Sequence, residues 1–230
     1  MSISDGNGSK ASLSTSAAPV KKERGVPRLE RPLPAAIFML AVVALMYLLE
    51  IIDQSTNLNL DQYGIKAHHL DGLPGMFAAP FLHASYGHLS ANALPFLVLG
   101  WLTMIGGLWR FLLTTLIVII TSGLAAWTLA FPKDNHVIYI VGASGVIVGW
   151  LAYLLLRGIF TRNIGQIIIS AVVLIAYGTA LFAVFPQSAN VSWQAHLGGA
   201  IGGVLAAWLL RRSGPTGLKS KASKVPAASL

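Results

Sequence analysis

Three polar clusters interrupt otherwise apolar stretches of this sequence, and together they contain the groups that acyl transfer requires. His88 and Asn92 lie in the first cluster, Ser144 in the second and His196 in the third. A serine becomes a nucleophile when a neighbouring base takes its proton, and donors such as His and Asn can stabilise the resulting oxyanion. The sequence therefore supplies one candidate nucleophile, one candidate base and two candidate oxyanion donors.

The first cluster places two hydrogen-bond donors on one helical face. His88 and Asn92 are four residues apart, so their side chains point to the same side of a helix. The alternative is that they hold helices together, as polar residues in membrane helices often do. A paired His and Asn at one depth favours a shared target over two separate packing contacts.

The second cluster surrounds a serine with glycines. Gly142 and Gly145 remove side chains around Ser144 and leave room for another backbone. The alternative is a packing face of small residues, since Gly145 and Gly149 form a GxxxG pair. Taken alone, this short motif favours packing over catalysis.

The third cluster places a histidine above a glycine groove. His196, Gly199 and Gly203 have the i, i+3, i+7 spacing of one helix face. One interpretation is a buried histidine at a helix crossing. The other is that the helix of Ser144 fits the groove and comes within hydrogen-bond reach of His196.

The elements that must position these groups are membrane helices. Hydrophobic residues make up 55% of the chain and charged residues 10%, whereas a soluble domain carries about 25% charged residues. A hydrocarbon core of about 30 Å requires about 20 apolar residues per helix. The apolar runs predict six spans, at about 34–52, 88–106, 110–131, 143–160, 164–185 and 193–210.

Charge distribution sets the expected topology. Residues 1–32 and 213–230 are polar and predict disordered cytoplasmic tails around a core at 33–212. With both termini in the cytoplasm, all of the 16 Lys and Arg residues except Lys66 and Lys133 lie inside, as the positive-inside rule requires. The net charge of +8 lies in tails and short loops and forms no basic face, which argues against a nucleic-acid partner.

The combination of motifs resembles the rhomboid family of intramembrane serine proteases. The resemblance covers roughly residues 34–210, and the motifs fall on the second, fourth and sixth spans, as in that family. The matching elements are His83-x4-His88-x3-Asn92, Gly142-x-Ser144-Gly145 and Ala195-His196-x2-Gly199-x3-Gly203.

The resemblance implies a role for each matching residue. Ser144 and His196 would form the catalytic dyad, and His88 and Asn92 would stabilise the oxyanion. The remaining positions would give structural support: His83, Gly142, Gly145, Gly199 and Gly203.

The resemblance also implies the fold and the activity. The expected fold is an all-α, six-transmembrane-helix, rhomboid-like bundle with a water-filled cavity and a gate at the fifth span. The expected activity is endopeptidase cleavage of transmembrane segments in membrane-protein substrates. The lack of a transit-like Arg/Ser-rich amphipathic segment and the compact six-span core favour a bacterial plasma membrane, and we expect no cofactor.

Two positions depart from the family pattern. The family often has a Trp-Arg pair in the first loop, where this chain has Pro74-Gly-Met-Phe77, so the loop must be anchored differently. Some members have a Tyr that stacks on the catalytic histidine, and here Val148 occupies that position.

Three other interpretations remain at this stage. One is an inactive relative that binds membrane proteins as a chaperone or adaptor, although such relatives usually lose Ser or His from the dyad. Another is a small transporter or channel, although no internal repeat or mid-membrane acid is evident. The third, metal binding by loop histidines, lacks a carboxylate or Cys at the usual spacing, so we expect no metal. Its candidate ligands are His68, His69, His83 and His88.

Overall fold

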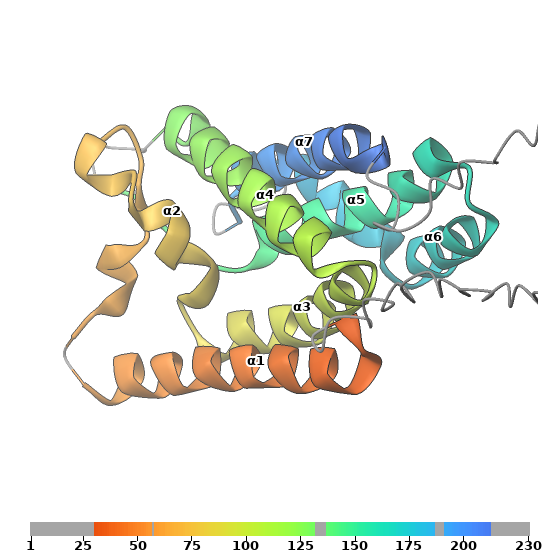
Figure 1. The fold of residues 1–230 in the computed structure, drawn as a ribbon. Coiled ribbons are helices and arrows are strands. Elements are labelled where there is room, and N and C mark those ends of the chain that lie inside the picture. Colours follow the sequence, from red (N-terminus) through yellow and green to blue (C-terminus); the bar gives the residue numbers. More distant parts are fainter. Residues whose placement is uncertain (1–29, 57, 132–136, 187–190, 213–230) are drawn as a thin grey trace, which may run out of the picture.

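The computed structural model describes residues 30–56, 58–131, 137–186 and 191–212 and consists mainly of packed helices (Figure 1). Each long helix begins within about two residues of its predicted start. Of the predicted tails, only residues 30–32 are described, and Pro32 already begins the first helix. The long helices are α1 (Pro32–Ser55), α3 (Tyr86–Ile105), α4 (Leu108–Leu129), α5 (Ser144–Thr161), α6 (Ile164–Tyr177) and α7 (Trp193–Leu209).

Within the described residues, five segments are long and apolar enough to cross a membrane. Four are α1, α3, α4 and α5, and the fifth joins α6 to the 3₁₀ helix η5 (Gly178–Val184). Helix α7 has 17 residues, and its length of about 26 Å falls short of a hydrocarbon core of about 30 Å. The fold is therefore an all-α membrane fold, and a sixth span formed by α7 remains a prediction.

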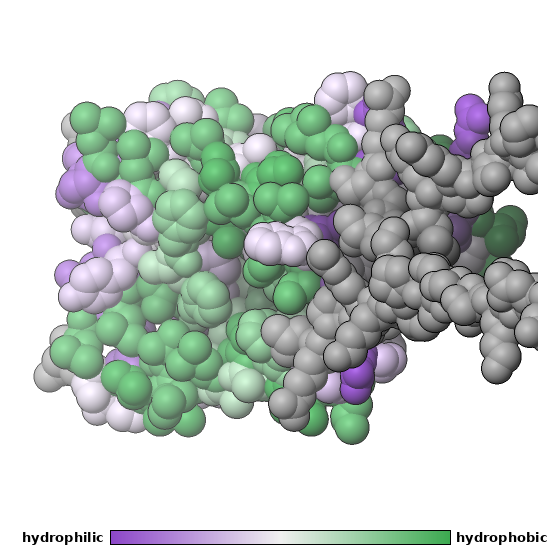
Figure 2. All heavy atoms as spheres, in the orientation of Figure 1, coloured by the Kyte–Doolittle hydropathy of each residue, from purple (hydrophilic) through white to green (hydrophobic). Residues whose placement is uncertain are grey.

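Helix α5 lies at the centre of the bundle. It packs against α3, α4, α6 and α7, and its residues Trp150, Leu151 and Tyr153 are fully buried. Helix α6 is the opposite case, because Ile168, Val172 and several neighbours are exposed. Figure 2 shows hydrophobic side chains across one face of the molecule. An apolar outer surface around a packed centre suits a helix bundle surrounded by lipid.

Helices α5 and α7 approach each other through glycines. A Cβ atom on Gly199 would lie 2.1 Å from the carbonyl oxygen of Gly145. A Cβ atom on Gly203 would lie 2.1 Å from the carbonyl oxygen of Gly149, one turn further along. Both distances are far inside van der Waals contact, so the two backbones can touch only because these positions lack side chains.

The long loop between α1 and α3 is folded. It contains one strand and several short helices, and the strand pairs antiparallel with β2, with Ile65 opposite Ile140. The indole of Trp127 on α4 donates to the carbonyl of His69 at 2.8 Å, which anchors the loop without the Trp-Arg pair. The elements are η2 (Leu60–Tyr63), β1 (Ile65–Lys66), η3 (Leu70–Gly72), α2 (Gly75–Ala78) and η4 (Ala79–Phe81), with β2 at Tyr139–Ile140.

Candidate active site

Ser144 begins α5, and the segment before it is held in place by the folded loop. Gly142 has φ +117°, a conformation that favours glycine, and its N–H donates to the carbonyl of Ala79 at 2.8 Å. A Cβ atom on Gly142 would also lie 2.6 Å from Cε1 of His88. Glycine is therefore required here twice, by the backbone conformation and by the histidine ring beside it.

His196 lies in the first turn of α7 and is buried. The helix begins at the N-cap Ser192, whose side chain accepts from the N–H of Ala195. The hydroxyl of Ser122 on α4 donates to the carbonyl of Ala195 at 2.8 Å, which fixes this turn against α4. Two hydrogen bonds, one to the N-cap Ser192 and one from Ser122 on α4, thus hold the helix end that carries the imidazole of His196.

The side chains of Ser144 and His196 are in hydrogen-bond contact. Nε2 of His196 lies 2.7 Å from Oγ of Ser144, and Nδ1 lies 2.9 Å from the carbonyl oxygen of Ala183. A carbonyl can only accept, so Nδ1 carries the proton and Nε2 is left to accept the proton of the serine hydroxyl. This is the arrangement that a nucleophile and its base require.

The carbonyl of Ala183 orients the imidazole, and sequence reasoning did not find it. Ala183 lies in η5, which follows α6. Val148, at the position where some family members have a stacking Tyr, is buried within α5. A backbone carbonyl has no side-chain signature, so only the path of the chain could show this partner.

His88 and Asn92 lie one turn apart on α3, and they differ in their surroundings. His88 lines the same cavity as Ser144. Asn92 is buried one turn further along, where its amide donates to the carbonyl of His88 at 2.8 Å. The structure thus places the ring of His88 beside Gly142, on the cavity that Ser144 also lines, and gives Asn92 a hydrogen bond within its own helix.

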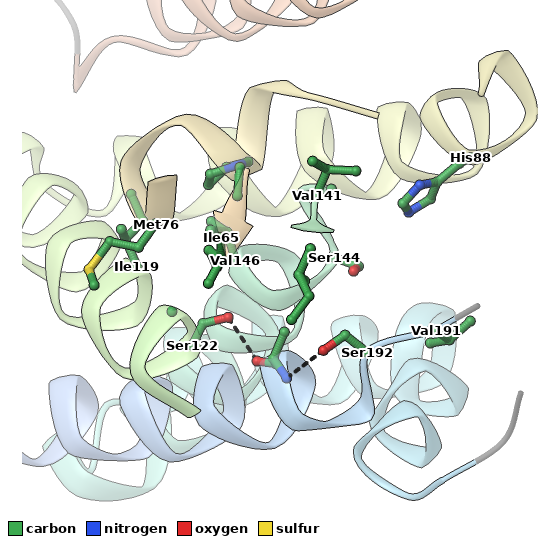
Figure 3. Close-up of a pocket in the computed structure, with 16 residues that line it drawn as sticks. Ile65, Met76, His88, Ile119, Ser122, Val141, Ser144, Val146, Val191 and Ser192 are labelled. Carbon is green, nitrogen blue, oxygen red and sulfur yellow. Dashed lines mark hydrogen bonds between the residues drawn. The ribbon is translucent and has the colours of Figure 1, made fainter. Parts of the chain in front are cut away.

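A cavity of about 260 Å³ lies in front of Ser144 (Figure 3). Its walls are largely apolar and come from the folded loop, α4 and the first turns of α5 and α7. The polar groups at its edge are those of Ser122, Ser144, His88 and Ser192. A cavity of this kind can hold an apolar side chain of a bound peptide, while the backbone of that peptide lies beside Ser144.

His83 supports the ring of His88 from behind. The two ring centroids are 5.1 Å apart in an edge-to-face arrangement. Burial, together with the neighbouring His88, lowers the pKa of His83 to about 4. His83 is therefore neutral at pH 7, and its ring packs against that of His88.

This shift predicts a loss of stability in acid that depends on His83. Its pKa is about 4 in the folded chain and 6.5 without the fold, so its contribution is complete above pH 6.5 and is lost as the pH falls toward 4. The full contribution is roughly 3 kcal/mol. Thermal unfolding of the detergent-solubilised protein should show a steeper acid loss for wild type than for His83→Leu. The exposed control His69→Leu should follow wild type, and equal slopes for wild type and His83→Leu would contradict the assignment.

Within the described residues, no three His, Asp or Glu side chains are grouped as metal ligands. His68 instead places Nε2 3.0 Å from the carbonyl of Ala130 and its ring 4.7 Å from that of Phe131. His68 and His69 thus contact the end of α4 from the folded loop. His83 and His88 lie together, and His88 lines the cavity of Ser144.

Comparison with known proteins shows the family to which the chain belongs. The Rhomboid domain family matches residues 71–213. An uncharacterized protein of Mycobacterium tuberculosis is 46% identical over 181 residues, covering 75% of this chain and 73% of that protein. An uncharacterized protein of Mycobacterium leprae is 44% identical over 198 residues, covering 83% and 77%. Rhomboid protease GluP of Bacillus subtilis is 32% identical over 199 residues, covering 81% of this chain but 36% of GluP.

A family match over more than half of the chain identifies the class of protein. The chain belongs to the rhomboid family, a family of membrane proteases, and it is a multi-pass membrane protein with bacterial homologues. This membership separates it from the transporter or channel considered above.

Proposed function

We propose that the protein is an intramembrane serine endopeptidase in which Ser144 is the nucleophile and His196 the base. The observation that carries this proposal is the 2.7 Å contact between Oγ and Nε2 in a chain of the rhomboid family. The carbonyl of Ala183 supports it, because it holds the imidazole in the tautomer that can accept a proton.

The reaction begins with a proton transfer within the dyad. His196 takes the hydroxyl proton of Ser144 as Oγ attacks the scissile carbonyl carbon, and a tetrahedral oxyanion forms. The imidazolium of His196 then protonates the leaving amine, and the peptide C–N bond breaks to give an acyl-serine. Water, deprotonated by His196, attacks the acyl carbon, and the acid product leaves as Oγ of Ser144 regains its proton.

The oxyanion requires donors at the serine. We assign this role to the ring of His88, to the amide of Asn92 and to the backbone N–H of Ser144. The position of His88 on the cavity beside Ser144 supports its share. Asn92 would act after its amide turns from the carbonyl of His88, or through its second N–H.

The topology that we propose has six spans, with α7 as the sixth and both termini in the cytoplasm of a bacterial cell. The core at 33–212 then lies in the plasma membrane between two cytoplasmic tails. The distribution of Lys and Arg along the sequence supports this orientation. Its consequence is that Ser144 and His196, at the first turns of α5 and α7, lie near the outer surface.

Cleavage inside a bilayer tests the proposal. The full chain is reconstituted in liposomes with a single-span substrate that has a Gly and a Pro in the outer half of its span, and products are mapped by mass spectrometry. Helix-weakening residues expose the scissile carbonyl, so we expect one cut in that half. The same substrate with Leu at both positions should be cut at least tenfold more slowly. Cuts confined to loops outside the bilayer would contradict the proposal.

The oxyanion assignment predicts a separate loss of rate. Removing one donor typically lowers kcat by about 10²–10³-fold. The kcat of His88→Ala should therefore be lower by that factor, with KM little changed. His69→Ala is the matched control, because His69 is exposed in the folded loop. The measurement is initial cleavage rate against substrate density in the liposome. A His88→Ala variant as active as His69→Ala would remove His88 from the oxyanion site.

A further inference from the structure

Two arginines from different helices converge on one carbonyl at the turn between α3 and α4. Nη1 of Arg110 on α4 and Nη2 of Arg157 on α5 each donate to the carbonyl oxygen of Gly106 at 3.0 Å. The turn has two glycines, and a Cβ atom on Gly106 would lie 2.1 Å from Nη1 of Arg157. A Cβ atom on Gly107 would lie 3.2 Å from Nη1 of Arg110. The backbone of the turn thus leaves space for both guanidinium groups.

Within the described residues, neither arginine of this pair forms an ion pair. The one ion pair in the part of the chain that the structure describes joins Lys66 to Asp71 in the folded loop. Glu30 is the acid at this turn, and its Oε1 accepts from the N–H of Leu108 at 2.8 Å. Two like charges held together in a half-buried place repel each other, and a carbonyl dipole offsets only part of that cost.

Capping of α3 explains one arginine better than two. A basic side chain near the end of a helix commonly bonds its last carbonyls. Here both guanidinium groups bond the same carbonyl, although each has five N–H donors. The guanidinium carbon of Arg157 also lies 5.8 Å from the centroid of the Tyr153 ring, and this cation–π contact holds the plane of the guanidinium group. The pair therefore presents fixed donors beyond those that the cap uses.

The pair lies at the basic end of the bundle. The turn between α3 and α4 is on the side where the chain enters α1 and leaves α7 (Figure 1). Arg31, Arg162 and Arg211 lie at this end too, at the start of α1, after α5 and after α7. In the proposed topology this end faces the cytoplasmic leaflet, whose surface carries anionic lipid.

We propose that Arg110 and Arg157 form a binding site for a phosphate group. Guanidinium forks match phosphate oxygens with paired hydrogen bonds, and two forks from two helices define one position between them. The phosphate would come from an anionic lipid headgroup at the membrane surface or from free phosphate in solution. Either source would neutralise the pair and join α4 to α5.

The test measures binding, and it does not depend on peptidase activity. The purified full chain in a neutral detergent is titrated with short-chain phosphatidylglycerol, phosphatidylcholine or inorganic phosphate, and thermal unfolding and native mass spectra are recorded. We expect phosphatidylglycerol to raise the unfolding temperature of wild type and to remain bound. Inorganic phosphate without lipid distinguishes the sources: a comparable rise identifies a free-anion site, and no rise identifies a headgroup site.

Matched variants decide whether the arginine pair is responsible. In Arg110→Gln, the concentration of phosphatidylglycerol that gives half of the rise in unfolding temperature should be about tenfold higher, as expected for the loss of one charge-assisted hydrogen bond. Arg110→Lys should retain part of it, which separates loss of charge from loss of fold. Arg211→Gln is the control, because Arg211 lies at the same end but stacks on Trp208. Equal responses of Arg110→Gln and Arg211→Gln would overturn the proposal, as would equal effects of phosphatidylglycerol and phosphatidylcholine with no effect of inorganic phosphate.

Discussion

Ser144→Ala is expected to abolish cleavage of a membrane substrate while leaving the fold intact. Removal of the serine nucleophile lowers kcat by roughly 10⁶-fold in a soluble serine protease, so the variant should fall below detection. The hydroxyl of Ser144 bonds the imidazole of His196 at the half-buried edge of a cavity, so its loss should change the unfolding temperature little. His196→Ala should give a loss of the same order, because the two groups act as one unit.

The control for this prediction is another serine-to-alanine change in the same bundle. Ser90 is exposed on α3, where its hydroxyl lies 3.1 Å from that of Tyr47. Ser90→Ala should retain the wild-type cleavage rate in the same liposomes. If Ser144→Ala cleaves as fast as Ser90→Ala, the nucleophile lies elsewhere.

Gly199→Ala is expected to have the second large effect, through helix packing. The added Cβ atom would lie 2.1 Å from the carbonyl oxygen of Gly145, so α7 must move away from α5. Overpacking of this kind costs about 1–3 kcal/mol, and a displacement of about 1 Å at a catalytic group can cost 10²-fold in rate. We expect a lower unfolding temperature and at least a 10²-fold slower cleavage, because His196 lies one turn from the altered position.

Two other glycines separate packing from alignment of the dyad. At Gly203 the added Cβ atom meets the carbonyl of Gly149, so Gly203→Ala should lower stability as much but cleavage less, since it lies two turns from His196. At Gly165 the nearest atom is Oδ1 of Asn163 at 3.4 Å, so Gly165→Ala should change neither property. A Gly199→Ala variant that behaves like Gly165→Ala would show that the close contact is dispensable.

Much of the helical framework could be predicted because lipid imposes a simple rule. A helix that crosses the bilayer must be apolar for about 20 residues, so the apolar runs predict where each long helix begins to within about two residues. The spacing of glycines on one face predicted that α7 would pack tightly. The sixth span stays a prediction, since α7 has 17 residues, at the lower limit of the length that a crossing helix needs.

Features built from backbone could not be predicted from residue types. The carbonyl of Ala183 orients His196 only because the chain changes from α-helix to 3₁₀ helix at Gly178 and brings η5 to the imidazole. The β1–β2 pair joins residues more than seventy positions apart and has two residues in each strand, too few for a pattern. The arginine pair could not be predicted either, because Arg110 and Arg157 meet only when α3, α4 and α5 are packed together.

Labelling of the serine by a fluorophosphonate tests the central claim most directly. The reagent reacts only with a hydroxyl activated by a base, so the full chain in detergent should be modified on the peptide that contains Ser144. Ser144→Ala should not be labelled, and His196→Ala should be labelled far more slowly. Failure of folded wild type to react, as an inactive adaptor would fail, or equal labelling of wild type and His196→Ala, would contradict a Ser144–His196 dyad.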